Sequence, residues 1–172
     1  MAKLNISEKE RAENKEIIRQ YRQLLRVLKP RLKKGEEDRL RLAFDVAVDA
    51  HKDMRRKSGE PYIYHPIAVA QIVAEEMGLG LTSVICALLH DTVEDTSMTL
   101  EDVEMNFGKT VSEIIAGLTK IEGVFTRTAS MQAENFKKML LTLSDDVRVI
   151  LVKIADRLHN MRTLLHMSRK TN

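Results

Sequence analysis

The chain has 172 residues, which is enough for one domain with an ordinary hydrophobic core and too few for two comfortable ones. Its 28 basic and 25 acidic residues nearly balance, so the net charge of +3 does not by itself indicate a nucleic-acid-binding protein. A hydrophobic fraction of 44% argues against disorder, and an aromatic content of 4% without Trp favours a helical core of aliphatic side chains.

The cysteine content and the apolar runs indicate the cellular compartment of the protein. Cys86 is the only cysteine and lies in an apolar run, so it cannot form a disulfide within the chain. A buried free thiol and a reducing compartment are therefore expected. The N-terminus lacks the apolar segment of a signal peptide, and no apolar run reaches the length of a membrane span. We expect a cytoplasmic protein without membrane contact.

Helical spacing of apolar residues begins near the N-terminus. Ser7 and Glu10 form a capping box, and the helix that they open should end at Pro30. The acidic residues 36–38 lead a second helix, whose apolar face includes His51. A hydrogen-bonded core histidine is the preferred interpretation of His51, and metal ligation is the alternative.

A break in the helical pattern follows at residues 55–62. It combines three adjacent cations with Ser, Gly and Pro, which is typical of a loop. The cations suit phosphate oxygens, although a solvated basic turn explains them as well. The next helix should open with His65, place Pro66 at its first position and end at Gly78.

Two further helices and a loop are predicted in the middle of the chain. The first helix should be capped by Thr82 or Ser83. Thr99 starts the second, short helix, which ends at residues 107–108.

A longer helix should follow and give way to a loop. Thr110 and Glu113 form a capping box for this helix. Residues 122–130, rich in Gly, Thr and Ser, lack periodicity and are predicted to be a mobile loop that is a candidate border of the functional site.

The last helix carries an apolar row and a polar row. Residues 144–146 should cap and charge its start. Its predicted apolar stripe consists of Val147, Ile150, Leu151, Ile154, Leu158, Met161 and Leu165. Asp156, Asn160 and Thr163 recur on another face, close to valines, so we expect this polar row to be buried too. A buried Asp156 needs a cation or several donors, and a salt bridge with Arg157 is the ordinary alternative.

The strongest chemical signal lies at residues 88–96. His90 and Asp91 close an apolar run, and Glu94 and Asp95 follow within a turn. If the helix continues, His90 and Glu94 share one face. Such a cluster can hold a divalent cation and a water molecule, and a solvated acidic helix end is the alternative.

Two imidazoles and two carboxylates come from three predicted helices. These candidate ligands are His65, His90, Asp91 and Asp156. A mixed nitrogen and oxygen set suits Mn²⁺, Fe²⁺, Co²⁺ or Zn²⁺ better than Ca²⁺ or Mg²⁺. The residues themselves leave the choice among these metals open.

Five motifs follow one another along the chain: RKSGEPY at residues 56–62, HP at 65–66, LHDTVEDT at 89–96, FG at 107–108 and DRLHNMRT at 156–163. In this order, the motifs resemble the HD phosphohydrolase superfamily, whose fold is an all-α helical bundle. More narrowly, they resemble the N-terminal hydrolase domain of the bifunctional RelA/SpoT homologues. The resemblance spans about residues 40–163.

The resemblance implies roles for the candidate metal ligands and the acidic pair. It implies that one Mn²⁺ per chain is held by His65, His90, Asp91 and Asp156. Glu94 and Asp95 match the acidic pair that orients the nucleophilic water.

The resemblance also implies a nucleotide pocket. Arg56, Lys57 and Ser58 match the loop that contacts the guanine nucleotide, and Asn160 and Thr163 line the same pocket. His51 and His159 match positions that are not ligands.

The implied reaction is hydrolysis of the 3′-diphosphate of (p)ppGpp to GDP or GTP and pyrophosphate, which degrades the alarmone of the stringent response. In such a site the metal acidifies water, and Glu94 or Asp95 accepts its proton. The alternatives are an HD nucleotidase of other specificity and a catalytically silent HD regulatory domain. A nucleic-acid arm in the N-terminal helix is less favoured because its charges alternate in sign.

We expect residues 1–172 to form a single hydrolase domain, with an N-terminal helix in residues 1–30 and a catalytic core at about 36–167. Long family members continue into synthetase and regulatory domains, whereas this chain stops at Asn172. A piece of a longer protein is preferred over a stand-alone small hydrolase. The expected partners are the alarmone and, in the full-length protein, a synthetase domain, but not a membrane or nucleic acid.

Overall fold

The computed structural model describes residues 7–125 and 146–170, with side chains described at residues 7–121 and 146–164. Within these ranges the chain is helical and contains no β-strand, so the all-α class is confirmed. The helices are α1 (Glu8–Leu28), η1 (Lys29–Arg31), α2 (Glu36–Ala50), α3 (Tyr64–Gln71), η2 (Ile72–Glu76), α4 (Leu81–Leu89), α5 (Thr92–Asp95), α6 (Leu100–Phe107), α7 (Lys109–Phe125) and α9 (Val147–Lys170). None of the helices in the described ranges is long and apolar enough to cross a membrane.

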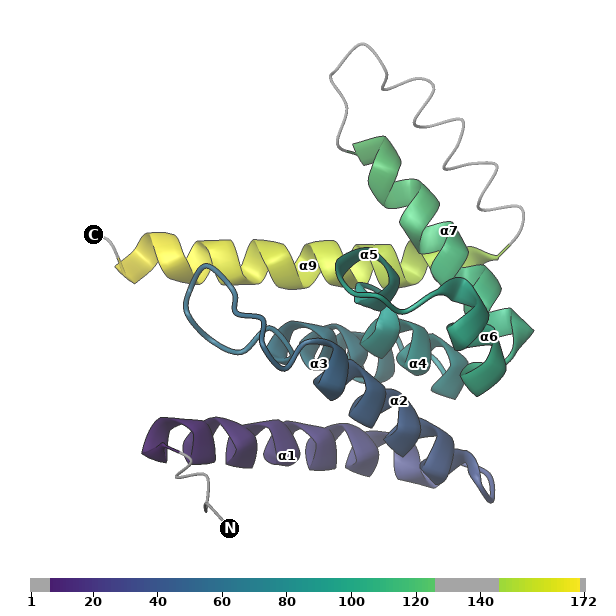
Figure 1. Ribbon diagram of the computed structural model, residues 1–172, viewed down its shortest axis with the longest axis horizontal. Coiled ribbons are helices and arrows are strands. Elements are labelled where there is room, and N and C mark those ends of the chain that lie inside the picture. Colours follow the sequence, from purple (N-terminus) through teal and green to yellow (C-terminus); the bar gives the residue numbers. More distant parts are fainter. Residues whose placement is uncertain (1–6, 126–145, 171–172) are drawn as a thin grey trace.

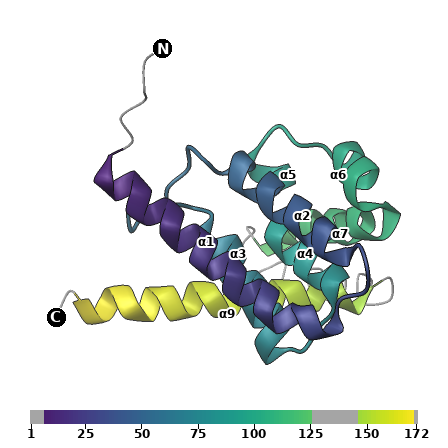
Figure 2. The ribbon, with the colours of Figure 1, turned by 90° about the horizontal axis from the view of Figure 1, so that it is seen from below.

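α4 is the central helix of the bundle. α2, α3 and α7 pack against it, and α6 packs against α7 (Figure 1). α1 and α9 both contact α3 and lie on opposite sides of it in Figure 1, and in the view from below α1 crosses in front of α9 (Figure 2). The end of α4 is thereby brought close to α3 and α9, the helices that carry the other candidate ligands.

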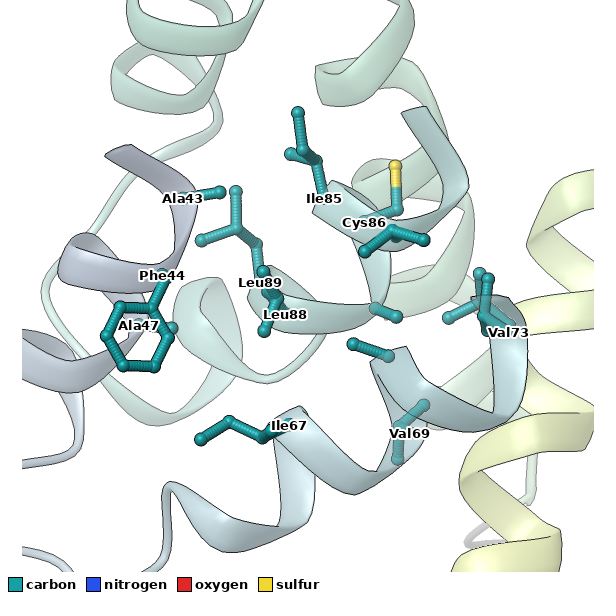
Figure 3. Close-up of a cluster of buried hydrophobic side chains, with 14 of the residues drawn as sticks. Ala43, Phe44, Ala47, Ile67, Val69, Val73, Ile85, Cys86, Leu88 and Leu89 are labelled. Carbon is teal, nitrogen blue, oxygen red and sulfur yellow. The ribbon is translucent and has the colours of Figure 1, made fainter. Parts of the chain in front are cut away.

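The core explains why α4 is apolar all round. Every residue from position 83 to 89 is buried, and a helix surrounded by other helices needs an apolar surface on all sides. Figure 3 shows Leu88 and Leu89 of α4 in one buried cluster with Phe44 of α2 and Ile67 of α3. Cys86 is a buried free thiol, as predicted, and burial raises its pKa to about 12.

The predicted capping box at Ser7 and the predicted helix start at Thr99 are confirmed. The backbone N–H of Glu10 donates to Ser7 Oγ at 3.2 Å, and the Glu10 carboxylate accepts from the Ser7 N–H at 2.8 Å. Thr99 and Asp102 make the same reciprocal pair at the start of α6. At the start of α9, Asp146 accepts the N–H of Arg148 at 2.9 Å. These starts are set by local hydrogen bonds.

The predicted starts of α4 and α7 are wrong. α4 begins at Leu81 with Gly80 as its cap, so Thr82 already lies inside the helix. α7 begins at Lys109, so Thr110 is a helical residue and not a cap. The free energy of packing the apolar faces decides these starts, because a hydroxyl cap contributes only about 1 kcal/mol.

The helix after the loop also differs from its prediction. Pro66 is the third residue of α3 rather than the first, a position that proline tolerates because the first N–H groups of a helix have no intrahelical partner. α3 then passes into the π-helix η2, whose wider turn no apolar spacing indicated. Gly78 follows with φ +67°, which fits its predicted place after the helix end.

The apolar stripe predicted for α9 is wrong at several positions. Val147, Ile154 and Met161 are 53%, 50% and 61% exposed, whereas Val149 and Val152 are buried. The buried face also includes Ala155 and Asp156, so the polar row is turned inward at that point, as expected. α9 carries two apolar rows, and contacts with α3, α4 and α7 select the row beside Asp156.

The loop predicted at residues 122–130 is wrong in its first part. α7 continues as a helix to Phe125. A single glycine costs a helix only about 1 kcal/mol and does not by itself end it. Residues 126–130 lie outside the described residues.

Candidate metal centre

The candidate ligands lie on three separate segments of the fold. His90 directly follows α4, and Asp91 is the N-cap residue of α5. His65 is the second residue of α3, and Asp156 lies in the first half of α9. α4 ends with His90 as its C-cap residue and the chain turns between α4 and α5, so helical geometry does not continue through residues 90–94. This turn directs both His90 and Asp91 toward one point.

Three of these side chains form a compact group. His65, His90 and Asp91 each offer one ligand atom, and the three atoms lie within 4.8 Å of one another. Nε2 of His90 lies 3.1 Å from Asp91 Oδ2, and Nε2 of His65 lies 3.8 Å from the same oxygen. Such spacing suits groups that share one cation.

Asp156 completes the group from the other side. Its Oδ1 lies 3.1 Å from Nε2 of His65 and 3.9 Å from Nε2 of His90. The structure thus brings together all four side chains that the sequence nominated as ligands. Both histidines and Asp156 are buried, and Asp91 is half-buried.

The residues fit a divalent cation. Nδ1 of His90 lies 2.7 Å from the Ala87 carbonyl oxygen, which can only accept, so this nitrogen carries a proton. Nε2 of His90 is buried and makes no well-aligned hydrogen bond among the described residues, although Asp91 Oδ2 lies 3.1 Å away. A buried polar atom without a partner is uncommon, and in a site of two imidazoles and two carboxylates a metal ligand bond accounts for it.

The two carboxylates are held by further side chains. The Tyr62 hydroxyl donates to Asp91 Oδ2 at 2.7 Å. Asp156 receives the Asn160 amide on Oδ1 at 2.8 Å and the Lys153 ammonium on Oδ2 at 2.9 Å. Sequence reasoning missed Tyr62 and Lys153. For Lys153 a signal existed in its i,i+3 spacing to Asp156, and the ion pair considered for Asp156 was with Arg157 instead.

His65 has a histidine as its partner. Nδ1 of His65 lies 2.7 Å from Nδ1 of His159, and the ring centroids are 4.9 Å apart. His159 is half-buried on α9, one turn after Asp156. His159 was not among the predicted site residues, and only the packing of α9 on α3 reveals this contact.

The pKa values of the candidate ligands depend on one another. Burial opposes protonation of His90, but the carboxylates of Asp91 and Asp156 raise its pKa to about 9. Burial also opposes ionisation of Asp91, yet the neighbouring His90 holds the pKa of Asp91 below its ordinary range. For Asp156, the hydrogen bond with His65 lowers the pKa against the effect of burial. Burial lowers the pKa of His65 and brings that of His159 to about 4.

Glu94 and Asp95 lie on α5 at the edge of this group, and both are exposed. The Asp95 N–H donates to the Asp91 backbone carbonyl at 2.9 Å, which fixes α5 directly after Asp91. Partial desolvation and the negative charge of Asp91 raise the pKa of Asp95.

One hydrogen bond connects the predicted basic loop to the residues that surround the candidate ligands. Nη2 of Arg56 donates to Asn160 Oδ1 at 2.8 Å, and Asn160 also holds Asp156. Nη1 of Arg56 is buried without a hydrogen-bond partner among the described residues. Lys57 and Ser58 are exposed at the turn.

Two other predicted positions are further from the ligands. The Thr163 hydroxyl donates a hydrogen bond to the Asn160 carbonyl oxygen of the same helix, at 2.9 Å. His51 is only 1% exposed, and its Nδ1 lies 2.8 Å from the Ala47 carbonyl oxygen, which confirms the hydrogen-bonded core position. Its ring stacks on Tyr62 with centroids 5.0 Å apart. His51 thus supports the residue that donates to Asp91.

Comparisons with known proteins show the family of this chain. A family profile described as "HD domain" matches residues 43–172. The chain is 48% identical over 145 residues to the bifunctional (p)ppGpp synthase/hydrolase SpoT of Escherichia coli, covering 84% of this chain and 20% of that protein. It is 51% identical over 126 residues to the guanosine-3′,5′-bis(diphosphate) 3′-pyrophosphohydrolase of Vibrio cholerae, covering 73% of this chain and 18% of that protein.

A solved structure shows the same similarity. It is that of a metazoan ortholog of SpoT, described as hydrolysing ppGpp, with a TM-score of 0.57 and 25% identity over 78% of this chain and 72% of that one. The resemblance to the hydrolase domain of the RelA/SpoT homologues is confirmed, although the chain spans only about a fifth of the length of the curated relatives it matches. The chain belongs to the HD domain family.

Proposed function

We propose that this chain hydrolyses the 3′-diphosphate of (p)ppGpp and releases pyrophosphate, with GDP or GTP as the second product. The observation that carries the proposal is the convergence of His65, His90, Asp91 and Asp156 in an HD domain. The names of the relatives supply the substrate, and the basic loop beside the ligands supports an anionic one.

The proposed cofactor is one Mn²⁺ per chain, held by His65, His90, Asp91 and Asp156. The mixed donor set supports a first-row divalent ion, and the family resemblance supports Mn²⁺ among them. A bound cation supplies Lewis acidity toward water and phosphoryl oxygens. The chain's own contribution is to fix the two carboxylates through Tyr62 and Lys153.

Glu94 and Asp95 are the proposed water-orienting acids. They lie on the exposed side of the ligand group, where a water molecule can approach. The raised pKa of Asp95 makes it a better proton acceptor than an ordinary aspartate, because a carboxylate of higher pKa is the stronger base. The pair therefore takes the proton of the attacking water.

The nucleotide is proposed to lie along the basic loop and α9. Arg56 offers a planar guanidinium that can stack on a base, and Lys57 and Ser58 offer exposed donors to phosphate oxygens. The bond between Arg56 and Asn160 supports this placement because it ties the loop to the metal centre. Thr163 lines the same side of α9.

The wider setting is part of the same proposal. Residues 1–172 act as one hydrolase domain, with α1 packed on α3, in a full-length protein that also carries a synthetase domain. Cys86, a buried free thiol, supports a reducing cytoplasmic compartment.

A substrate panel tests the reaction. The purified chain with Mn²⁺ is incubated with ppGpp, GTP and dGTP, and the nucleotide products and pyrophosphate are separated and quantified. The expected result is GDP and pyrophosphate in equal amounts from ppGpp and no turnover of the triphosphates. Hydrolysis of GTP or dGTP with ppGpp untouched would contradict the proposed substrate and indicate a different nucleotidase.

A further inference from the structure

The two histidines of the metal centre are oriented by different kinds of partner. Nδ1 of His90 faces the Ala87 carbonyl oxygen, which fixes a proton on Nδ1 and leaves Nε2 as a lone pair in the neutral ring. Nδ1 of His65 faces Nδ1 of His159 at 2.7 Å. An imidazole nitrogen can donate or accept, so this contact does not by itself decide the tautomer of His65.

The contact permits two arrangements of protons. Two nitrogens at 2.7 Å need one proton between them. If His159 donates, the proton of His65 lies on Nε2, which then faces Asp156 Oδ1 at 3.1 Å and cannot bind a cation. If His65 donates from Nδ1, its Nε2 carries the lone pair, and His159 holds its own proton on Nε2.

We propose that His159 is a positioning residue for the metal centre: its Nδ1 lone pair accepts the Nδ1–H of His65 and thereby selects the tautomer of His65 that binds a cation. The two arrangements hold the same number of protons, so selecting one of them neither takes up nor releases a proton. His159 performs for His65 the task that the Ala87 carbonyl performs for His90.

α9 carries both His159 and the candidate ligand Asp156. Asp156 and His159 are one turn apart, so the packing that brings Asp156 to His65 also brings the His159 ring. Arg162 makes two bonds to Glu76 of η2 at 2.6 and 2.9 Å, which ties the next turn of α9 to the segment that continues α3. The positions of α3 and α9 along one another are thereby fixed at the histidine pair.

The test compares two substitutions of the same residue. His159→Leu removes the acceptor, and His159→Asn places an amide oxygen close to where Nδ1 lies. Met161→Ala, an exposed position on the same helix, is the matched control. Free Mn²⁺ is measured by electron paramagnetic resonance in titrations without nucleotide, and thermal unfolding of the metal-free proteins reports whether each variant folds.

His159→Leu is expected to weaken Mn²⁺ binding by about 10–100-fold, the range found when partners of ligating histidines are removed. His159→Asn is expected to retain most of the affinity, and Met161→Ala all of it. Wild-type affinity in His159→Leu, or an equal loss in the Leu and Asn variants, would overturn the acceptor role. The inference rests on the metal site of the proposed function, and a wild-type chain that binds no Mn²⁺ would instead contradict that site.

A second measurement on the wild-type chain does not depend on how the variants fold. Nitrogen-15 spectra of histidine-labelled protein loaded with diamagnetic Zn²⁺ report which ring nitrogens carry protons. The expected pattern has a proton on Nδ1 of His65 and none on Nδ1 of His159. The reverse pattern would overturn the proposal.

Discussion

At the scale of single residues, each ligand of the metal centre has its own support. The Ala87 carbonyl oxygen holds His90, and His159 holds His65. Tyr62 holds Asp91, and Lys153 holds Asp156. The ligand types could be predicted because each is a recognisable donor within a motif. Of the supporting residues, Lys153 could have been predicted from its i,i+3 spacing to Asp156. Tyr62 and His159 could not, because each contacts a ligand on another segment of the chain, and residue spacing along one helix says nothing of such contacts.

The charge of His90 predicts how metal binding depends on pH. In the metal-free protein its pKa is about 9 against an ordinary 6.5, so the protonated ring adds stability below pH 6.5, and this stability is lost as the pH rises through 9. Mn²⁺ must displace this proton, so its affinity should rise up to about tenfold per pH unit between pH 7 and 9 and then level off. Calorimetric titrations at several pH values check this, and an affinity independent of pH would contradict it.

Tyr62→Phe tests the hydroxyl that holds Asp91. The substitution removes the 2.7 Å donor and keeps the ring that stacks on His51. Mn²⁺ affinity should fall by about tenfold or more, with little change in melting temperature, because the lost bond orients a ligand. Tyr64→Phe, two residues further on and half-buried, serves as the control. Equal affinities of the two variants would remove Tyr62 from the site.

At the scale of helices and loops, the sequence predicts correctly the helix starts that are set by hydrogen bonds between neighbouring residues. The capping boxes at Ser7 and Thr99 are in place because their hydrogen bonds need only adjacent residues. The start of α4, the π-helix η2 and the buried face of α9 depend on packing against other helices, so apolar spacing could not give them.

A pair of truncations on α9 tests which face is packed. Val152 is fully buried, and Ile154 is 50% exposed. Val152→Ala should lower the free energy of unfolding by about 2 kcal/mol, because it leaves a cavity. Ile154→Ala removes more atoms yet should change it by only about 0.5 kcal/mol or less. Urea unfolding measures both, and the opposite order would show that the predicted apolar stripe is the packed face.

The basic loop is tested through substrate binding. Arg56→Ala should raise KM for ppGpp with a smaller effect on kcat, because the guanidinium binds the nucleotide before and during the reaction. Arg11→Ala, an exposed arginine on α1, should leave KM unchanged. Steady-state kinetics with Mn²⁺ provides both constants, and an unchanged KM in Arg56→Ala would remove this residue from the pocket.

At the scale of the whole molecule, the site exists only because α3, the α4–α5 turn and α9 meet around the end of α4 (Figure 1). The order of the motifs was enough to predict an all-α HD fold through the family resemblance. The convergence of candidate ligands that are spread over residues 65–156 of the sequence follows from the packing of a helical bundle and not from any one segment. The helix that supplies Asp156 also supplies Asn160 and His159, which links the candidate metal centre to the basic loop.

The most direct test of this account measures pyrophosphate release from ppGpp and bound Mn²⁺ on the same samples of the wild-type chain, Asp156→Ala and Glu94→Ala. The wild type should bind one Mn²⁺ and release pyrophosphate, Asp156→Ala should lose both, and Glu94→Ala should keep the metal and lose turnover. Full release of pyrophosphate by Asp156→Ala without bound metal would contradict the claim that the converging side chains form a catalytic metal centre.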